Sequence, residues 1–241
     1  MSTLSPTLPR PPIVEEPALV DHLLRDPVAL DRRFAEAAGV SVELPRLVGL
    51  TVAAFAAYAA AQGLIVTRAG AEVFPAALWR MDAWRAGACL FLAYSGGMFG
   101  AQVAGLPSAW FYALLAGLRT PANRIVAEAM RAQATSAMVL LGLLPLYLAA
   151  GLGLSLATGE DVGSAFLRNA FFVPVGYGLP FLAGLSGTFA LYRAFQRMVV
   201  TGARAESPRT ATPGRLVLAW SVLFTGMAPL GVWRILDTLI H

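Results

Sequence analysis

Five apolar segments, each long enough to cross a lipid bilayer as a helix, constrain what this chain can fold into. They lie at residues 47–66, 86–106, 134–157, 169–191 and 216–236. About 20 residues at about 1.5 Å each match a hydrocarbon core of roughly 30 Å. The composition agrees, because 57% hydrophobic and 13% charged residues are unusual for a soluble domain. We therefore predict an all-α polytopic membrane protein with five transmembrane helices within residues 46–241.

Residues 1–45 differ from the rest of the chain. They begin with a stretch rich in Pro, Ser and Thr, in which no apolar run of signal-peptide length follows a basic start. Leucines then alternate with charged residues between Pro17 and Ala38, and Asp26 followed by Pro27 fits the N-cap and first position of a helix. We expect short amphipathic helices on the membrane surface, or alternatively a helix pair that contacts only solvent.

The arginines predict the orientation in the membrane. Most of them lie in the N-terminal segment and in the connections after the second and fourth spans, and loops rich in basic residues stay cytoplasmic. We therefore expect a cytoplasmic N-terminus and a C-terminus on the other side. The absence of lysine and the abundance of alanine indicate a bacterium with a GC-rich genome, hence a bacterial inner membrane.

The basic balance also bears on partners. The arginines flank apolar spans, where anionic lipid headgroups bind them well. We expect contacts with such lipids and with other membrane protein subunits. We expect no nucleic-acid partner, although the isoelectric point is near 9.7.

The segment from Leu106 to Pro145, called here the hinge, holds a compact group of charges between two spans. Its first part carries an aromatic cluster, and residues 109–118 are too few to cross a bilayer as a helix. We therefore expect an interfacial segment anchored by Trp110, Phe111 and Tyr112, and an extension of the second span is the alternative.

The second part of the hinge is predicted to be an amphipathic helix that starts at Thr120 and Pro121. Arg124, Glu128 and Arg131 follow at spacings of four and three, which places them on one helix face. We expect this face to contact a partner protein. Pairing within the chain and contact with lipid headgroups are the alternatives.

The predicted spans carry little chemistry. They contain no Asp or Glu, and their arginine, Arg234, lies at the rim, which disfavours a proton- or sodium-coupled carrier. Both histidines lie outside the spans, so no histidine-built metal or haem site is expected in the membrane. We expect no cofactor and no metal.

Small residues predict close helix packing at two places. Gly96 and Gly100 lie four residues apart in the second span, and Gly176, Pro180 and Gly184 repeat at the same spacing in the fourth. Such spacing removes side chains from one helix face, so a second backbone can approach.

Two short patterns resemble motifs of a membrane enzyme and of a transporter. The sequence Gly184-Leu185-Ser186-Gly187 is similar to the GxSG motif of rhomboid proteases, but the fifth span supplies no histidine base. Glu128-Ala129 followed by Leu144-Pro145 resembles the EAA loop of importer-type ABC permeases, with Met130 in place of its second alanine. That resemblance implies a permease subunit in which residues 120–133 form the coupling helix that touches an ATPase.

A further resemblance concerns the whole chain. A basic N-terminus with short helices, five Gly- and Pro-rich spans and almost no tail after the last span resemble the Yip1 family and its bacterial relatives. The resemblance supplies no site residues. It implies a non-catalytic membrane protein that acts through contacts with other membrane proteins or lipids. We therefore expect a scaffold or accessory subunit of a membrane complex, with the permease subunit as the alternative.

Overall fold

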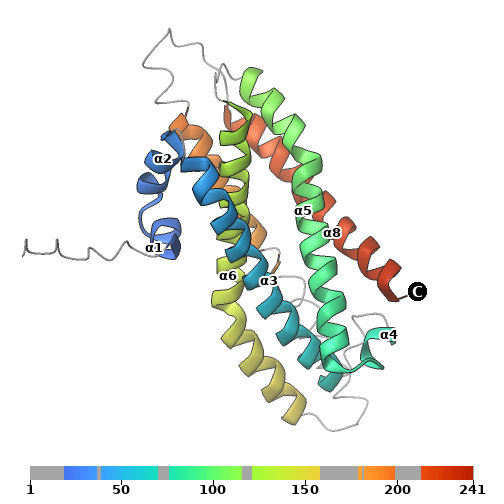
Figure 1. Cartoon of the computed structure of the whole chain (residues 1–241). Helices are drawn as coiled ribbons and strands as arrows, with labels where there is room; N and C mark the ends of the chain where they lie inside the picture. The colour runs from blue at the N-terminus through green and yellow to red at the C-terminus, as the bar shows by residue number, and fades with distance from the viewer. Residues whose placement is uncertain are drawn as a thin grey trace, which may run out of the picture.

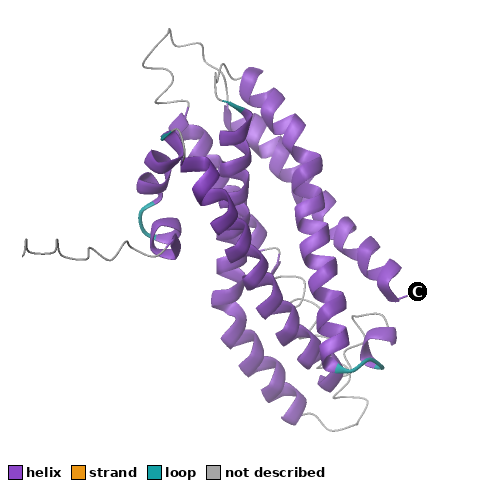
Figure 2. Ribbon diagram, in the orientation of Figure 1, coloured by secondary structure: helices purple, strands orange, loops and turns teal. Residues whose placement is uncertain are grey.

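The computed structural model of this chain is built from helices. It describes residues 19–36, 39–69, 76–115, 121–157, 179–180, 182–198 and 213–240. These residues contain no strand, which confirms the all-α prediction for the part of the chain described (Figure 2). By length and composition, three helical stretches can cross a membrane: Gly39–Thr67, Ala83–Phe111 and Ala122–Gly153. Five crossings stay a prediction.

Two short helices precede the first of these stretches. They are α1 (Leu19–Leu24) and α2 (Pro27–Ala35). The predicted N-cap is confirmed, because Asp26 Oδ1 accepts a hydrogen bond of 3.0 Å from the backbone N–H of Ala29, and Pro27 occupies the first helical position. The cap satisfies one of the N–H groups that a helix start leaves without an intrahelical acceptor.

The long helices extend beyond the predicted spans. Helix α3 (Gly39–Ala69) begins before Leu47 and continues through Pro45, and α5 (Ala83–Leu115) continues through Pro107. Residues 107–115 therefore extend the helix of the second span, which is one of the two placements expected for this segment. Residues 107–115 are too few to cross a bilayer alone, but as the end of α5 they need no separate crossing. With 33 residues, α5 is about 50 Å long and exceeds the hydrocarbon core.

Helix α6 (Ala122–Ala157) unites the second part of the hinge with the third span. Its start directly after Pro121 agrees with the predicted helix start, and it runs without interruption for 36 residues. The remaining helices are α4 (Ala76–Trp79), residues 182–198 and α8 (Pro213–Ile240). The predicted fourth span, residues 169–191, lies partly outside the described residues.

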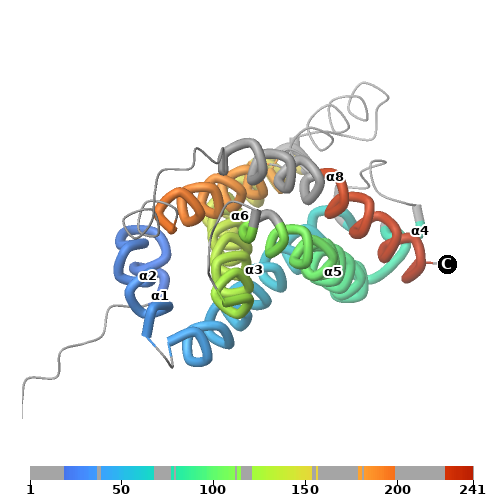
Figure 3. The backbone as a smooth tube through the Cα atoms, turned by 90° about the horizontal axis from the view of Figure 1, so that it is seen from above, coloured from blue at the N-terminus to red at the C-terminus, as the bar shows by residue number. Residues whose placement is uncertain are grey.

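The long helices lie side by side as a bundle (Figure 1). Helix α3 packs on both α5 and α6, and α8 packs on α5. Seen from above, α1 and α2 lie at one edge of the bundle and the C-terminal part of α8 at the opposite edge (Figure 3). The bundle interior between α3 and α6 holds an aromatic pair, in which the rings of Tyr58 and Tyr147 stack with centroids 5.9 Å apart.

Candidate functional site

The N-terminal helices are docked on the bundle by an apolar contact. Leu23 of α1 and Leu30 and Phe34 of α2 are buried against Leu47 of α3 and against Met130 of α6. The apolar side of α2, predicted to lie on the membrane surface, therefore packs on protein instead. The physical reason is that apolar side chains of α3 and α6 remove those of α2 from water, as acyl chains of a lipid would.

A charged cluster accompanies this apolar contact, called here the Asp31 cluster and formed by Asp31, Glu128, Arg131 and Arg197. Asp31 of α2 accepts a hydrogen bond from Arg131 Nη1 on its Oδ1, and one of 2.6 Å from Arg197 Nε on its Oδ2. Arg131 Nη1 also donates to Glu128 Oε2 at 3.2 Å. One carboxylate thus joins α2, α6 and residues 182–198.

The Asp31 cluster is electrically balanced and largely buried. Glu128 is 1% exposed and Arg131 is 3% exposed, whereas Asp31 and Arg197 are partly exposed. Two carboxylates face two guanidinium groups, so the formal charges cancel. Buried ions are tolerated only when they are paired and hydrogen-bonded, because desolvation otherwise costs more than their attraction returns. The cluster therefore holds the helices together, because separating its members would leave a buried ion unpaired at a large cost in free energy.

A second ionic contact lies beside the first and joins α2 to α3. Arg33 Nη1 donates to Glu43 Oε1 at 2.7 Å, and Arg33 Nη2 is 3.2 Å from His22 Nε2 of α1. Arg46 reaches the same oxygen of Glu43 at 3.5 Å. Glu43 is almost fully buried, so its pairing contributes to the position of the α3 N-terminus.

The predicted partner-contact residues occupy this internal site. Glu128 and Arg131 do lie on one helix face, as their spacing predicts, but that face points into the Asp31 cluster and not outward. Arg124 is half-buried one turn earlier on α6. Contact of these residues with an external partner stays a prediction. In this structure the partner of Glu128 and Arg131 is the chain itself.

Sequence reasoning did not identify Asp31 and Arg197 as partners of the hinge. Asp31 is separated from Arg131 by 100 positions and from Arg197 by 166. No local spacing rule relates residues so far apart. The signal that was available is the rarity of carboxylates near the spans, which makes each one a candidate partner for a buried arginine.

The predicted interfacial anchors lie on the last turns of α5. Trp110 and Phe111 are exposed there, and Tyr112 belongs to the same helix, although its side chain is outside the described part. An interfacial position for these aromatics stays a prediction.

The predicted packing glycines show where helices approach closely. The tight crossing of α5 and α8 lies at Gly97, where an added Cβ would be 2.5 Å from the backbone N of Val232. Gly96 faces Ile235 beside it, whereas no atom of the described residues lies within 4 Å of a Cβ at Gly100. The close approach is thus shifted by one residue from the predicted pair.

The fourth span shows a similar shift. An added Cβ at Gly187 would be 2.0 Å from Ser136 Oγ, whereas at Gly184 no atom of the described residues lies within 4 Å. Pro180 is half-buried, and Gly176 lies outside the described residues. A glycine therefore permits the close contact between α6 and residues 182–198, but this glycine is Gly187 and not the predicted Gly184.

Within the described ranges, no group of three or more His, Cys, Asp or Glu side chains is placed to hold a metal ion. Comparisons with known proteins returned no match, whether to a family model, to a curated protein or to a solved structure. A functional assignment for this chain therefore rests on its residues and their contacts.

Proposed function

We propose that this chain is a non-catalytic integral membrane protein of the Yip1-like kind, a scaffold or accessory subunit that acts through contacts with other membrane proteins and with lipids. The observation that carries the proposal is the Asp31 cluster. Glu128 and Arg131, the hinge residues whose helix face was expected to contact a partner, instead bind each other and Asp31, and so hold α2 against the bundle.

The outer surface of the bundle supports the same proposal. Large apolar side chains are exposed on several helices, among them Leu92 and Val103 on α5, Leu146 on α6 and Leu230 on α8. Such a surface suits acyl chains or the helices of another membrane protein. The permease alternative gains no support, because its coupling helix would present Glu128 and Arg131 to an ATPase, and α2 covers that face.

The proposal includes five crossings with a cytoplasmic N-terminus in a bacterial inner membrane. Helix α8 has 28 residues and is about 42 Å long, which is sufficient for a crossing. Residues 182–198 continue the predicted fourth span. The arginines of the N-terminal segment and the hinge support a cytoplasmic position for the α1 and α2 end of the bundle.

Affinity purification of the tagged full-length chain in a mild detergent tests this function. We expect a stable membrane protein partner without nucleotide-binding motifs. A lipid or peptide turned over by the purified chain alone would overturn the proposal.

A surface variant separates the two functions. Asn123 is exposed at the start of α6, where a coupling helix would meet its ATPase. If the chain is a scaffold, its partner should still copurify with the Asn123→Arg variant. If an ATPase copurifies with the wild-type chain and no longer copurifies with Asn123→Arg, the permease is supported.

A further inference from the structure

A small cavity lies where α5, α6 and residues 182–198 meet, away from the Asp31 cluster. Its volume is about 20 Å³, and its lining is mostly small or polar. Helix α6 contributes Ala129, Ala132, Gln133 and Ser136, residues 182–198 contribute Gly184, Gly187, Thr188 and Leu191, and α5 contributes Gln102.

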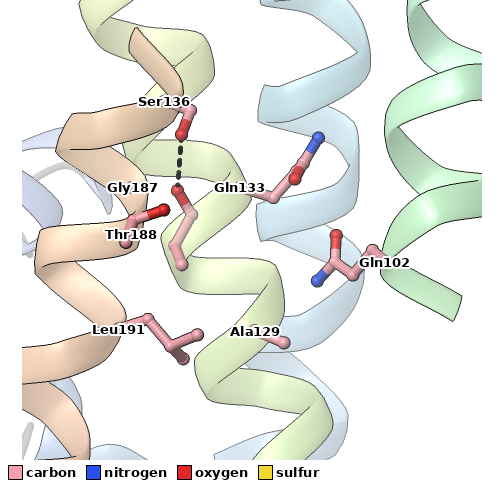
Figure 4. Close-up of a pocket in the computed structure, with 9 residues that line it drawn as sticks. Gln102, Ala129, Gln133, Ser136, Gly187, Thr188 and Leu191 are labelled. Atoms are coloured by element: carbon pink, nitrogen blue, oxygen red, sulfur yellow. Dashed lines mark hydrogen bonds between the residues drawn. The ribbon is translucent and has the colours of Figure 1, made fainter. Parts of the chain in front are cut away.

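Two glutamines give the cavity its chemical character. In Figure 4 the amide side chains of Gln133 and Gln102 extend from α6 and α5 toward the space between these helices. Each residue is 3% exposed. The carbonyl oxygen Oε1 of Gln102 and the amide nitrogen Nε2 of Gln133 have no hydrogen-bond partner in the described part of the chain.

The helix packing explains why a cavity exists beside these amides. Gly187 lets residues 182–198 approach α6 so closely that a Cβ there would meet Ser136 Oγ. At Gly184 and Ala129 the same helices carry side chains too small to fill the adjacent space. Both glutamines beside this space keep an unused hydrogen-bonding atom.

The free atoms define the ligand. One is an acceptor and the other a donor, and neither is charged. The complementary group must donate and accept at once, and it must be small. A water molecule needs roughly 10–15 Å³ of such space, so the cavity holds one group of that size. In a bilayer an unpaired buried amide is costly, which favours occupation.

We propose that this cavity binds a single hydroxyl group, bridged between Gln102 Oε1 and Gln133 Nε2. The hydroxyl belongs to a water molecule or to the alcohol end of an uncharged lipid such as a diacylglycerol. An anionic headgroup does not fit, because no cation lines the cavity among the described residues.

The chain allows a direct test, because it contains four glutamines, Gln62, Gln102, Gln133 and Gln196. In protein labelled with ¹⁵N-glutamine and embedded in lipid nanodiscs, the side-chain NH₂ signal of Gln133 is identified by its loss in Gln133→Leu. We expect that signal to show magnetisation transfer from the bound hydroxyl, and we expect the transfer to be lost in Gln102→Leu.

The source of the hydroxyl is read from the partner signal. Transfer from protons at the water frequency identifies water, and transfer that includes lipid protons and vanishes with deuterated diacylglycerol identifies a lipid alcohol. Gln196→Leu is the matched control, since Gln196 is exposed and bonded to Tyr192, so the transfer to Gln133 should remain.

Absence of any transfer to Gln133 in the wild-type protein, or transfer that persists in Gln102→Leu, overturns the proposal. If Gln102→Leu does not fold, Gln102→Met preserves the length of the side chain, removes the acceptor and gives the same readout.

Discussion

At the residue scale, Asp31 connects elements that are far apart in the sequence. Its two carboxylate oxygens accept hydrogen bonds from two arginines of different elements. A single side chain of α2 thus binds both α6 and residues 182–198. Removing its charge leaves Arg131 with Glu128 as its remaining carboxylate partner. The cost of such a change comes mainly from the buried cation that is left behind.

Asp31→Asn should therefore lower the free energy of unfolding by about 2 kcal/mol, less than for a fully buried pair because Asp31 is partly exposed and Arg131 keeps Glu128. Thermal unfolding of the protein in detergent measures the effect. Asp21→Asn is the matched control, because Asp21 pairs with Arg25 on the exposed surface, and its loss should cost less than about 0.5 kcal/mol. Equal effects of the two changes would contradict a structural role for the Asp31 cluster.

The two aspartates of α2 show which residue roles the sequence predicts. The cap at Asp26 follows from its neighbours, because a side chain that bonds an N–H three residues on depends only on local spacing. The pairing of Asp31 depends on how distant helices come together. Glu128 and Arg131 illustrate both cases, since their shared helix face was predictable and its burial was not.

At the scale of elements, α2 acts as an amphipathic helix whose apolar side is bound by protein. Leu30 is fully buried, whereas Val28 on the same helix is exposed. The docking therefore depends on one side of α2, in addition to the Asp31 cluster.

Leu30→Ala should weaken this docking by about 3 kcal/mol, because it removes buried methyl groups and leaves a cavity. Hydrogen exchange of the backbone amides in α1 and α2 should rise roughly a hundredfold, while α3 remains protected. Val28→Ala should leave the exchange nearly unchanged. Uniform loss of protection in α3 and α6 would show that α2 does not detach as a separate unit.

The crossing of α5 and α8 gives a second prediction at this scale. Gly97→Ala places a methyl group against the backbone of Val232, which cannot move without shifting α8, so a loss of at least about 2 kcal/mol is expected. Gly100→Ala faces open space and replaces glycine within a helix, so stability should be unchanged or rise by up to about 1 kcal/mol. Thermal unfolding compares them, and a more damaging Gly100→Ala would contradict the described crossing.

Two prolines show why the helices extend beyond the predicted spans. Pro45 and Pro107 lie inside α3 and α5, although proline usually marks the end of a soluble helix. In a membrane bundle such interruptions are tolerated, because nearby groups satisfy the freed carbonyl and water does not compete for it. Hydropathy located the centres of the helices, but tertiary packing determined their length.

At the scale of the whole molecule, the two ends of the described chain lie at opposite ends of the bundle. Leu30 and Phe34 of α2 pack near the starts of α3 and α6. Leu236 of α8 packs instead with Leu78 and with Ala86 near the start of α5, and Ile240 packs against the same cluster. If the bundle axis is normal to the membrane, this arrangement favours an odd number of crossings, and five crossings stay a prediction.

A reporter fused after His241 tests this topology. We expect alkaline phosphatase, which is active only outside the cytoplasm, to be active at this position, and green fluorescent protein, which folds in the cytoplasm, to be dark there. Fused before Met1, the two reporters should give the reverse result, because the arginines of the N-terminal segment and the hinge retain that end in the cytoplasm. Cytoplasmic signals at both termini would require an even number of crossings. Helix α8 would then lie along the membrane, in spite of its packing along α5.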